Sequence, residues 1–196
     1  LSLKEVHRFA SDPVYMNDVF TWDFLRLFLE LKRGILKAYQ GGDSDIASIG
    51  IDTWGVDFGL LSKDGQLLGN PIHYRDSRTD GMIEKACLRV PAEKIYEITG
   101  IAFQKFNTLY QLLALNEADS VLLKDADCLL FIPDLFNYFL TGKKAAECSI
   151  ASTSRRICRA ISSLSTTRQV QIYFLTPTTP GATSPPLGTT TPAPTS

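Results

Sequence analysis

Apolar residues along the first 154 positions follow two periods, and these periods predict a mixture of helices and strands. The clearest helical pattern covers residues 22–39, where aromatic and aliphatic side chains recur every three or four positions. Gly41 follows this stretch and is expected to end the helix. Thr21 is expected to cap its first turn, with Asp23 favouring the positive end of the helix dipole.

Runs of β-branched and aliphatic residues predict the strands. These predicted strands are residues 1–9, 46–51, 56–61, 66–68, 71–74 and 129–132, with a loop over residues 10–20. Lys63, Asp64 and Gly65 form a hairpin turn signal between two of the runs. The short strand after this turn is therefore expected to return antiparallel to the strand before it.

Helical patterns dominate after residue 78. The predicted helices are residues 79–90, residues 91–100, one that begins at Thr108, residues 119–125 and residues 135–140. Pro91 and Pro133 stand where proline favours the first turn of a helix. Strands followed by helices around a single sheet predict an α/β domain.

The composition is that of an ordinary globular protein, with 44% hydrophobic residues and a formal net charge of −1. This charge argues against a nucleic-acid partner or a membrane surface, and no apolar run has the length of a membrane span. The four cysteines lack the paired spacing of a zinc site. Free thiols and the charged first residues, which do not resemble a signal peptide, predict a cytoplasmic protein.

The composition changes abruptly near the end of the chain. Residues 155–196 contain no Asp, Glu or Lys, are rich in Thr, Pro and Ser, and carry four Arg, for a formal charge of +4. We therefore expect a folded domain over residues 1–154. Residues 155–196 are expected to be a disordered tail or the product of a shifted reading frame.

The centre of the chain carries the strongest candidate site, at the junction of two predicted strands. Asp52, Thr53, Trp54 and Gly55 interrupt the apolar pattern, and Asp57 lies just inside the second strand. Rigid strands suit a polar small-molecule site. A plain tight turn that uses the freedom of glycine explains the same residues equally well.

The remaining polar residues give limited information about the kind of ligand that this site would bind. The chain contains no glycine-rich nucleotide loop and no nucleophile elbow. Tryptophan near carboxylates and side-chain amides suits a polyol, because the ring covers C–H groups and the polar groups bind hydroxyls. The candidates for a polyol site are Trp54, Asp52, Asp57, Asn107, Tyr110 and Gln111. Arg75, Asp76 and Arg78 have two possible roles, because they could form ion pairs at the start of a helix or line a pocket.

Several motifs in consistent order resemble the rhamnulokinases, which are sugar kinases of the FGGY family. The matching stretches are SIGIDTWGVDF (48–58), YRDSRT (74–79), FNTLYQL (106–112), PDLF (133–136) and LTGK (140–143). The resemblance runs from about residue 3 to residue 154. It implies an actin-like, ribonuclease-H-like α/β domain, with a mixed sheet flanked by helices.

The resemblance also implies the activity, which is transfer of the ATP γ-phosphoryl group to L-rhamnulose with Mg²⁺, giving the 1-phosphate. Small-molecule sugar and ATP are then the partners. Gly55 matches the position where the family's first domain contacts the sugar. The expected substrate-binding residues are Gly55, its neighbours Asp52, Thr53, Trp54 and Asp57, and the weaker matches Phe106 and Asn107.

Two parts of the family pattern are missing from these 196 residues. The Asp-x-Gly phosphate loop and the His-Asp-Thr stretch that holds the catalytic base are both absent. We therefore expect no catalytic residue in this chain, no metal ligand and negligible kinase activity. A non-catalytic sugar-binding or interaction domain is the alternative, and fuculose or xylulose are alternative sugars.

Overall fold

The computed structural model describes residues 3–41 and 45–151. The expected tail over residues 155–196 therefore lies outside the described residues. The described part contains short strands and mostly short helices, with one long helix near its start.

A β-hairpin opens the fold where the sequence predicts a loop. Its strands are β1 (Pro13–Met16) and β2 (Val19–Trp22), which pair antiparallel with Met16 opposite Val19. Asn17 and Asp18 form the two-residue turn with φ angles of 51° and 60°, a conformation that these residue types tolerate. The loop prediction is wrong because only the turn, and no apolar alternation, marks this exposed hairpin.

The strand predicted at residues 1–9 is also wrong, because the described residues 3–12 form no strand ladder. Helix α1 (Phe24–Gln40) follows the hairpin and ends at Gly41 as predicted. Its cap is Asp23, whose carboxylate accepts a hydrogen bond from the Arg26 N–H at 3.1 Å. Thr21 instead belongs to β2, so its predicted role as the cap is wrong.

The central sheet pairs β3 (Phe58–Leu61) with β4 (Cys128–Phe131) in antiparallel orientation. The predicted strand at residues 46–51 is wrong, because this extended segment forms only an isolated bridge at Ser48. A strand requires a ladder of hydrogen bonds with a neighbour, which apolar sequence alone does not supply. Strand β3 begins two residues later than predicted.

Two other predicted strands are reduced to single bridges. After the turn that ends at Gly65, Leu67 bridges Leu61 in the predicted antiparallel sense. Ile72 bridges Thr21, and the Trp22 N–H donates to the carbonyl of Pro71 at 2.9 Å. The second contact joins the β-hairpin to the middle of the chain.

Five helices lie close to their predicted positions, and they are α2 (Met82–Arg89), α3 (Ala92–Thr99), α4 (Thr108–Glu117), α5 (Val121–Lys124) and α6 (Ile132–Thr141). The short helices η1 (Ser77–Thr79) and α7 (Cys148–Ala151) were not among the predicted helices. Gly100 and Gly142 end α3 and α6 in the left-handed conformation typical of helix C-termini. Among the helices of the described residues, none combines the length and apolar character needed to cross a bilayer.

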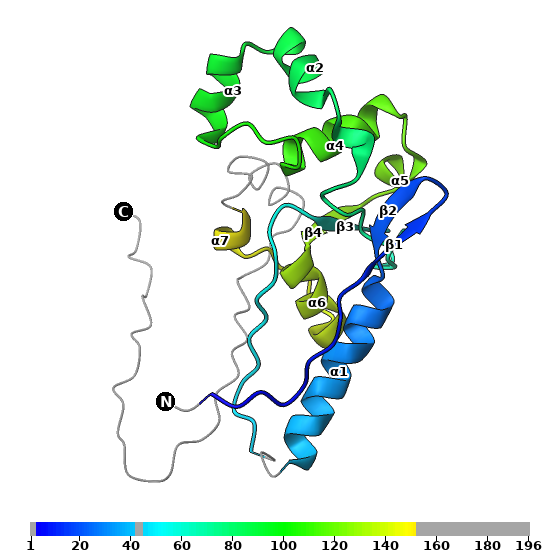
Figure 1. The fold of residues 1–196 in the computed structure, drawn as a ribbon, viewed down its shortest axis with the longest axis vertical. Helices are drawn as coiled ribbons and strands as arrows, with labels where there is room; N and C mark the ends of the chain where they lie inside the picture. The colour runs from blue at the N-terminus through cyan, green and yellow to red at the C-terminus, as the bar shows by residue number, and fades with distance from the viewer. Residues whose placement is uncertain (1–2, 42–44, 152–196) are drawn as a thin grey trace, which may run out of the picture.

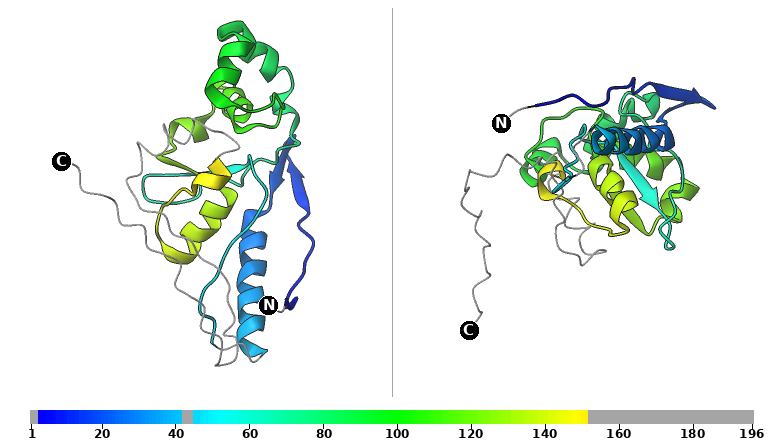
Figure 2. Two further views of the ribbon diagram at one scale, coloured as in Figure 1. Left: turned by 90° about the vertical axis from the view of Figure 1, so that its left-hand side faces the viewer. Right: turned by 90° about the horizontal axis from the view of Figure 1, so that it is seen from below.

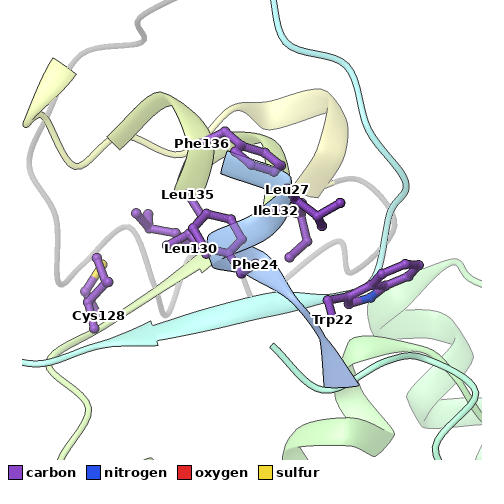
Figure 3. Close-up of a cluster of buried hydrophobic side chains, with 9 residues drawn as sticks. Trp22, Phe24, Leu27, Cys128, Leu130, Ile132, Leu135 and Phe136 are labelled. Carbon is purple, nitrogen blue, oxygen red and sulfur yellow. The ribbon is translucent and has the colours of Figure 1, made fainter. Parts of the chain in front are cut away.

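The two faces of the β3–β4 sheet are buried against different helices, because successive strand residues point to opposite faces. Leu61 and Leu130 pack with α1 and α6 in one cluster (Figure 3), whereas Phe58 and Phe131 pack with Leu115 of α4 in another. A third cluster joins α2, α3 and α4. Figures 1 and 2 show these three helices gathered at the end of the molecule away from α1 and α6.

Candidate sugar-facing site

Asp57 is the centre of the candidate site and is fully buried. Its Oδ2 accepts hydrogen bonds from Nε1 of Trp22 at 2.7 Å, Nε1 of Trp54 at 3.0 Å and the Tyr74 N–H at 3.2 Å. Its Oδ1 accepts one from Nε2 of Gln111 at 3.0 Å. Burial raises the pKa of Asp57, while these four hydrogen bonds act in the opposite direction by stabilising the anion.

Gln111 connects Asp57 to a second part of the chain. Its Nε2 donates to the carbonyl of Phe106 at 2.8 Å as well as to Asp57. Its Oε1 accepts a hydrogen bond from a terminal nitrogen of Arg78 at 2.6 Å. The Arg78 side chain is only 16% exposed and lies 3.5 Å from Oδ1 of Asp76. The polar 75–78 stretch therefore includes an ion pair and the cap of η1, as one reading of the sequence predicts.

The backbone between Gly55 and Asp57 makes an unusually tight turn. The Asp57 N–H donates to the carbonyl of Gly55 at 2.9 Å, which defines a three-residue γ-turn. Val56 at its centre has a φ angle of 68°. This conformation ends the extended segment and delays the start of β3.

Aromatic rings surround the same carboxylate. The rings of Trp22 and Trp54 lie 4.2 Å apart between centroids, and His73 stacks on Trp22 at 4.2 Å. Burial, and then the positive charge of Arg75, lower the pKa of His73 to about 4. His73 is therefore neutral near pH 7, and its Nδ1 accepts a hydrogen bond from the Arg75 N–H at 3.0 Å. The Trp22–Trp54–His73 stack is a rigid apolar wall beside Asp57.

The structure brings the first group of predicted site residues together in one short segment. Asp52 is exposed, while Thr53, Trp54 and Gly55 are half-buried, so all four reach the surface. Thr53 Oγ1 donates to the carbonyl of Trp54 at 3.1 Å. Asp57 differs, because it is buried and both of its oxygens are occupied by donors. Asp57 therefore holds the Trp54 ring in place through a hydrogen bond. Direct contact between Asp57 and a sugar stays a prediction.

The second group lies at the start of α4. Phe106 is 36% exposed and meets Tyr74 edge to face at 6.1 Å. Asn107 is half-buried, and its Nδ2 donates to the carbonyl of Ala102 at 2.8 Å. Gln111 joins this group to Asp57, so residues 52–57 and residues 106–107 are linked by one side chain.

The sequence did not reveal three partners of this site. Trp22 follows a helical pattern and contacts Asp57 from 35 positions away. Thr108 is a plain helix-start residue in sequence, yet its hydroxyl donates to the carbonyl of Val56 at 2.8 Å. The tight turn that Gly55 suggested is present, but no local signal places Val56 at its centre, because valine rarely adopts a positive φ angle.

The described residues do not offer the ligand set that a metal ion needs. No group of three or more His, Cys, Asp or Glu side chains in this part of the chain is arranged to hold one. Asp57, the central carboxylate of the site, already accepts N–H donors on both oxygens and has no second carboxylate beside it, among the residues that the structure describes, to share a cation. The residues present therefore do not fit a magnesium site.

Residues 15–158 match the model of the FGGY family of carbohydrate kinases, N-terminal domain. The chain belongs to this FGGY family. The match includes the turn at Val56, the whole Asp57 network and the start of α4. The family resemblance seen in the sequence motifs is thereby confirmed.

Relatives of this FGGY chain include proteins named rhamnulokinase. The chain is 45% identical to that of Oceanobacillus iheyensis over 157 residues, which cover 80% of this chain and 33% of the relative. It is 46% identical to that of Pectobacterium atrosepticum over 158 residues, covering 79% of this chain and 31% of the relative. The chain thus spans about a third of the length of the curated relatives it matches.

Solved structures support the fold of this FGGY chain. A ligand-bound xylulose kinase from Lactobacillus acidophilus superposes with a TM-score of 0.65 at 24% identity, covering 71% of this chain and 29% of that one. Plasmodium falciparum glycerol kinase with ADP gives 0.62 at 15% identity, covering 75% and 33%. At such identities the likeness shows the fold alone, and it confirms the predicted actin-like α/β class.

Proposed function

We propose that this chain supplies part of the sugar-facing wall of a carbohydrate kinase that phosphorylates L-rhamnulose at its 1-hydroxyl. Its similarity to proteins named rhamnulokinase supports the choice of sugar. The observation that carries the proposal is the Asp57 network, which holds Trp54 and the neighbouring Gly55 peptide at a rigid, half-buried surface. Preorganised walls of this kind bind a polyol at low entropic cost.

The proposed roles follow from these positions. Gly55 has no side chain, so a sugar can approach its backbone closely. Trp54 offers ring surface to C–H groups, because its N–H is already directed at Asp57. Asp52, Thr53 and Asn107 provide polar groups for hydroxyls, and Phe106 contributes apolar surface. Fuculose and xylulose are the sugars to compare.

ATP is proposed as the phosphoryl donor of the whole kinase, as its family implies, with Mg²⁺ as the accompanying ion. The described residues hold no site that fits the ion, so no step of the reaction is assigned to it here. The residues of this chain bind and orient the sugar. The predicted cytoplasmic location, and the absence of nucleic-acid or membrane partners, stay predictions.

Calorimetric titration of the chain with L-rhamnulose, L-fuculose and D-xylulose tests the proposal. We expect L-rhamnulose to bind more tightly than the other two ketoses. Gly55→Val should abolish this binding, because a branched side chain would occupy the space of the sugar. Gly69→Ala is the matched control, since a Cβ there makes ordinary contact, at 3.4 Å, with Leu122. Equal affinity for all three sugars, or unchanged binding by Gly55→Val, would contradict the proposal.

A further inference from the structure

The γ-turn at Val56 is strained. Positive φ angles are disfavoured for β-branched residues, and this form of γ-turn is rare in proteins. Such a conformation is energetically unfavourable and persists only where the surrounding structure enforces it. The strained residue directly follows Gly55, the best-supported sugar contact.

Two buried side chains hold the carbonyl of Val56. Thr108 Oγ1 donates to it at 2.8 Å, and Gln111 Nε2 lies 3.3 Å from it. Thr108 is fully buried and Gln111 is 1% exposed. Both come from the first turn of α4, where residues three positions apart share one face of the helix. We call Thr108 and Gln111 the clamp, because both side chains contact the carbonyl of Val56 from helix α4.

The neighbours of Gln111 fix the orientation of its amide. The two N–H groups of Nε2 donate to the carbonyl of Phe106 at 2.8 Å and the carboxylate of Asp57 at 3.0 Å, and the carbonyl of Val56 at 3.3 Å shares one of them as a third acceptor. Oε1 faces the guanidinium of Arg78. The reverse orientation would place an oxygen against three acceptors and an NH₂ group against a donor. Arg78 thus determines which end of the amide meets the γ-turn.

We propose that Thr108 and Gln111 are positioning residues that hold Val56 in the γ-turn and thereby present the Gly55 peptide to the sugar. Arg78 assists by orienting Gln111. The inference rests on the proposed function for its sugar. The clamp also joins residues 55–57 to residues 106–107, so both predicted parts of the sugar wall move as one unit.

A purely structural role predicts different behaviour. If the γ-turn serves only the stability of the fold, variants that disrupt it should change the free energy of unfolding without changing the affinity for sugar. If the turn positions Gly55, removal of the clamp should weaken sugar binding even where the protein stays folded. Adding Val56→Gly to a variant that lacks one clamp side chain tests the strain itself, because glycine adopts a positive φ angle without strain and leaves the other clamp side chain in place.

The experiment combines amide hydrogen exchange with calorimetry on the full chain. Thr108→Val removes the hydroxyl at nearly constant shape, and Gln111→Met removes the amide at similar length. We expect each to accelerate exchange of the Asp57 amide and to weaken L-rhamnulose binding about tenfold, which corresponds to about 1.4 kcal/mol. Thr108→Ser, which keeps the hydroxyl, should restore both properties. Adding Val56→Gly to Thr108→Val should partly restore both properties, because an unstrained turn needs less support from the clamp.

Thr79→Val is the matched control, because Thr79 is also buried and its hydroxyl also donates to a backbone carbonyl, that of Asp76. It should change neither Asp57 exchange nor sugar affinity. Unchanged exchange in Thr108→Val and Gln111→Met would overturn the clamp. Faster exchange with unchanged affinity would overturn the positioning role. If the parent chain binds no sugar, the proposed function fails, and with it the positioning role, while the exchange data still decide whether the clamp exists.

Discussion

Two buried aspartates in this chain have opposite surroundings. Asp57 accepts four hydrogen bonds. Asp134, at 3% exposure, accepts one from the Glu147 N–H at 3.1 Å, and among the described residues its Oδ2 has no hydrogen-bond partner. Burial raises the pKa of Asp134 to about 7, and the negative charge of Glu147 adds to this effect. At Asp134 the fold therefore favours the protonated form, whose O–H needs less solvation than a carboxylate.

This pKa shift predicts a dependence of stability on pH. An unfolded aspartate has a pKa of about 3.9, so between that value and about 7 Asp134 binds more protons in the native state than in the unfolded state. The contribution of Asp134 to the free energy of unfolding should therefore fall by roughly 2–4 kcal/mol as the pH rises across this window. His73 contributes in the opposite direction, because its lowered pKa makes the unfolded state bind more protons in the lower part of the window. Urea unfolding of the chain at a series of pH values from 4 to 8 measures the slope.

Asp134→Asn should make the slope more positive across this window, because asparagine does not titrate and the opposing contribution of His73 remains. The raised pKa of Asp57 is present in both proteins, so the difference between the two pH profiles reports Asp134. Asp119→Asn is the control: its carboxylate is 81% exposed, and asparagine tolerates the positive φ angle of 52° at this position. The same slope in Asp134→Asn as in the parent would show that Asp134 does not contribute.

At the scale of elements, strand β3 and helix α6 pack closely at Gly59. A Cβ at Gly59 would lie 2.6 Å from Cδ2 of Leu135 and 3.1 Å from Cδ1 of Leu67. Leu135 is fully buried in the cluster shared by α1 and α6 (Figure 3), so its side chain has little room to move. Glycine at this position lets the helix pack directly on the strand.

Gly59→Ala should therefore destabilise the protein by about 1–3 kcal/mol, the usual effect of overpacking a core. Thermal or urea unfolding measures the change. Leu135→Ala alone should cost about 2–5 kcal/mol, because it leaves a cavity. In the double variant the two effects should partly cancel, since the new methyl group enters that cavity. Strict additivity would show that the two residues do not share the same space.

The elements that the sequence predicted well are those with local signals. Prolines at helix starts and glycines at helix ends located α3 to within one residue and α6 to within three. The hairpin β1–β2 was missed because its exposed residues lack alternation. Residues 46–51 look like a buried strand, but a strand depends on a partner that the local pattern does not encode.

The sequence predicted the part of the candidate site that has local signals. The polar interruption at residues 52–57 is visible as a break in an apolar run, and Gln111 stands out as a polar residue on an apolar helix. The contacts of Asp57 with Trp22 and of Thr108 with Val56 join positions more than thirty residues apart. Only the tertiary fold brings these residues together, so spacing could not reveal them.

At the scale of the whole molecule, the Asp57 network connects two groups of helices. Trp22 belongs to the cluster of α1 and α6, whereas Gln111 comes from α4, which packs with α2 and α3. The candidate sugar wall thus lies where the two helical groups meet the sheet (Figure 1). Both groups of helices therefore hold the candidate sugar wall in place.

The 196 residues of this chain should bind sugar without transferring phosphate. Phosphoryl transfer depends on groups that bind the phosphates and a base that accepts the hydroxyl proton, and neither motif occurs in this sequence. We expect no ATP-dependent formation of L-rhamnulose 1-phosphate by the purified chain, measured by phosphorus NMR. An active rhamnulokinase serves as the positive control. Turnover that survives repeated purification would contradict this prediction.

The pairing of two indoles on one carboxylate oxygen has an optical consequence. The chain contains only two tryptophans, and their rings lie 4.2 Å apart at an angle of 37°. Transition dipoles so close and not parallel couple as an exciton, which splits the tryptophan band into a circular-dichroism couplet. Because both rings depend on Asp57, the amplitude of that couplet reports the geometry of this one site without any label.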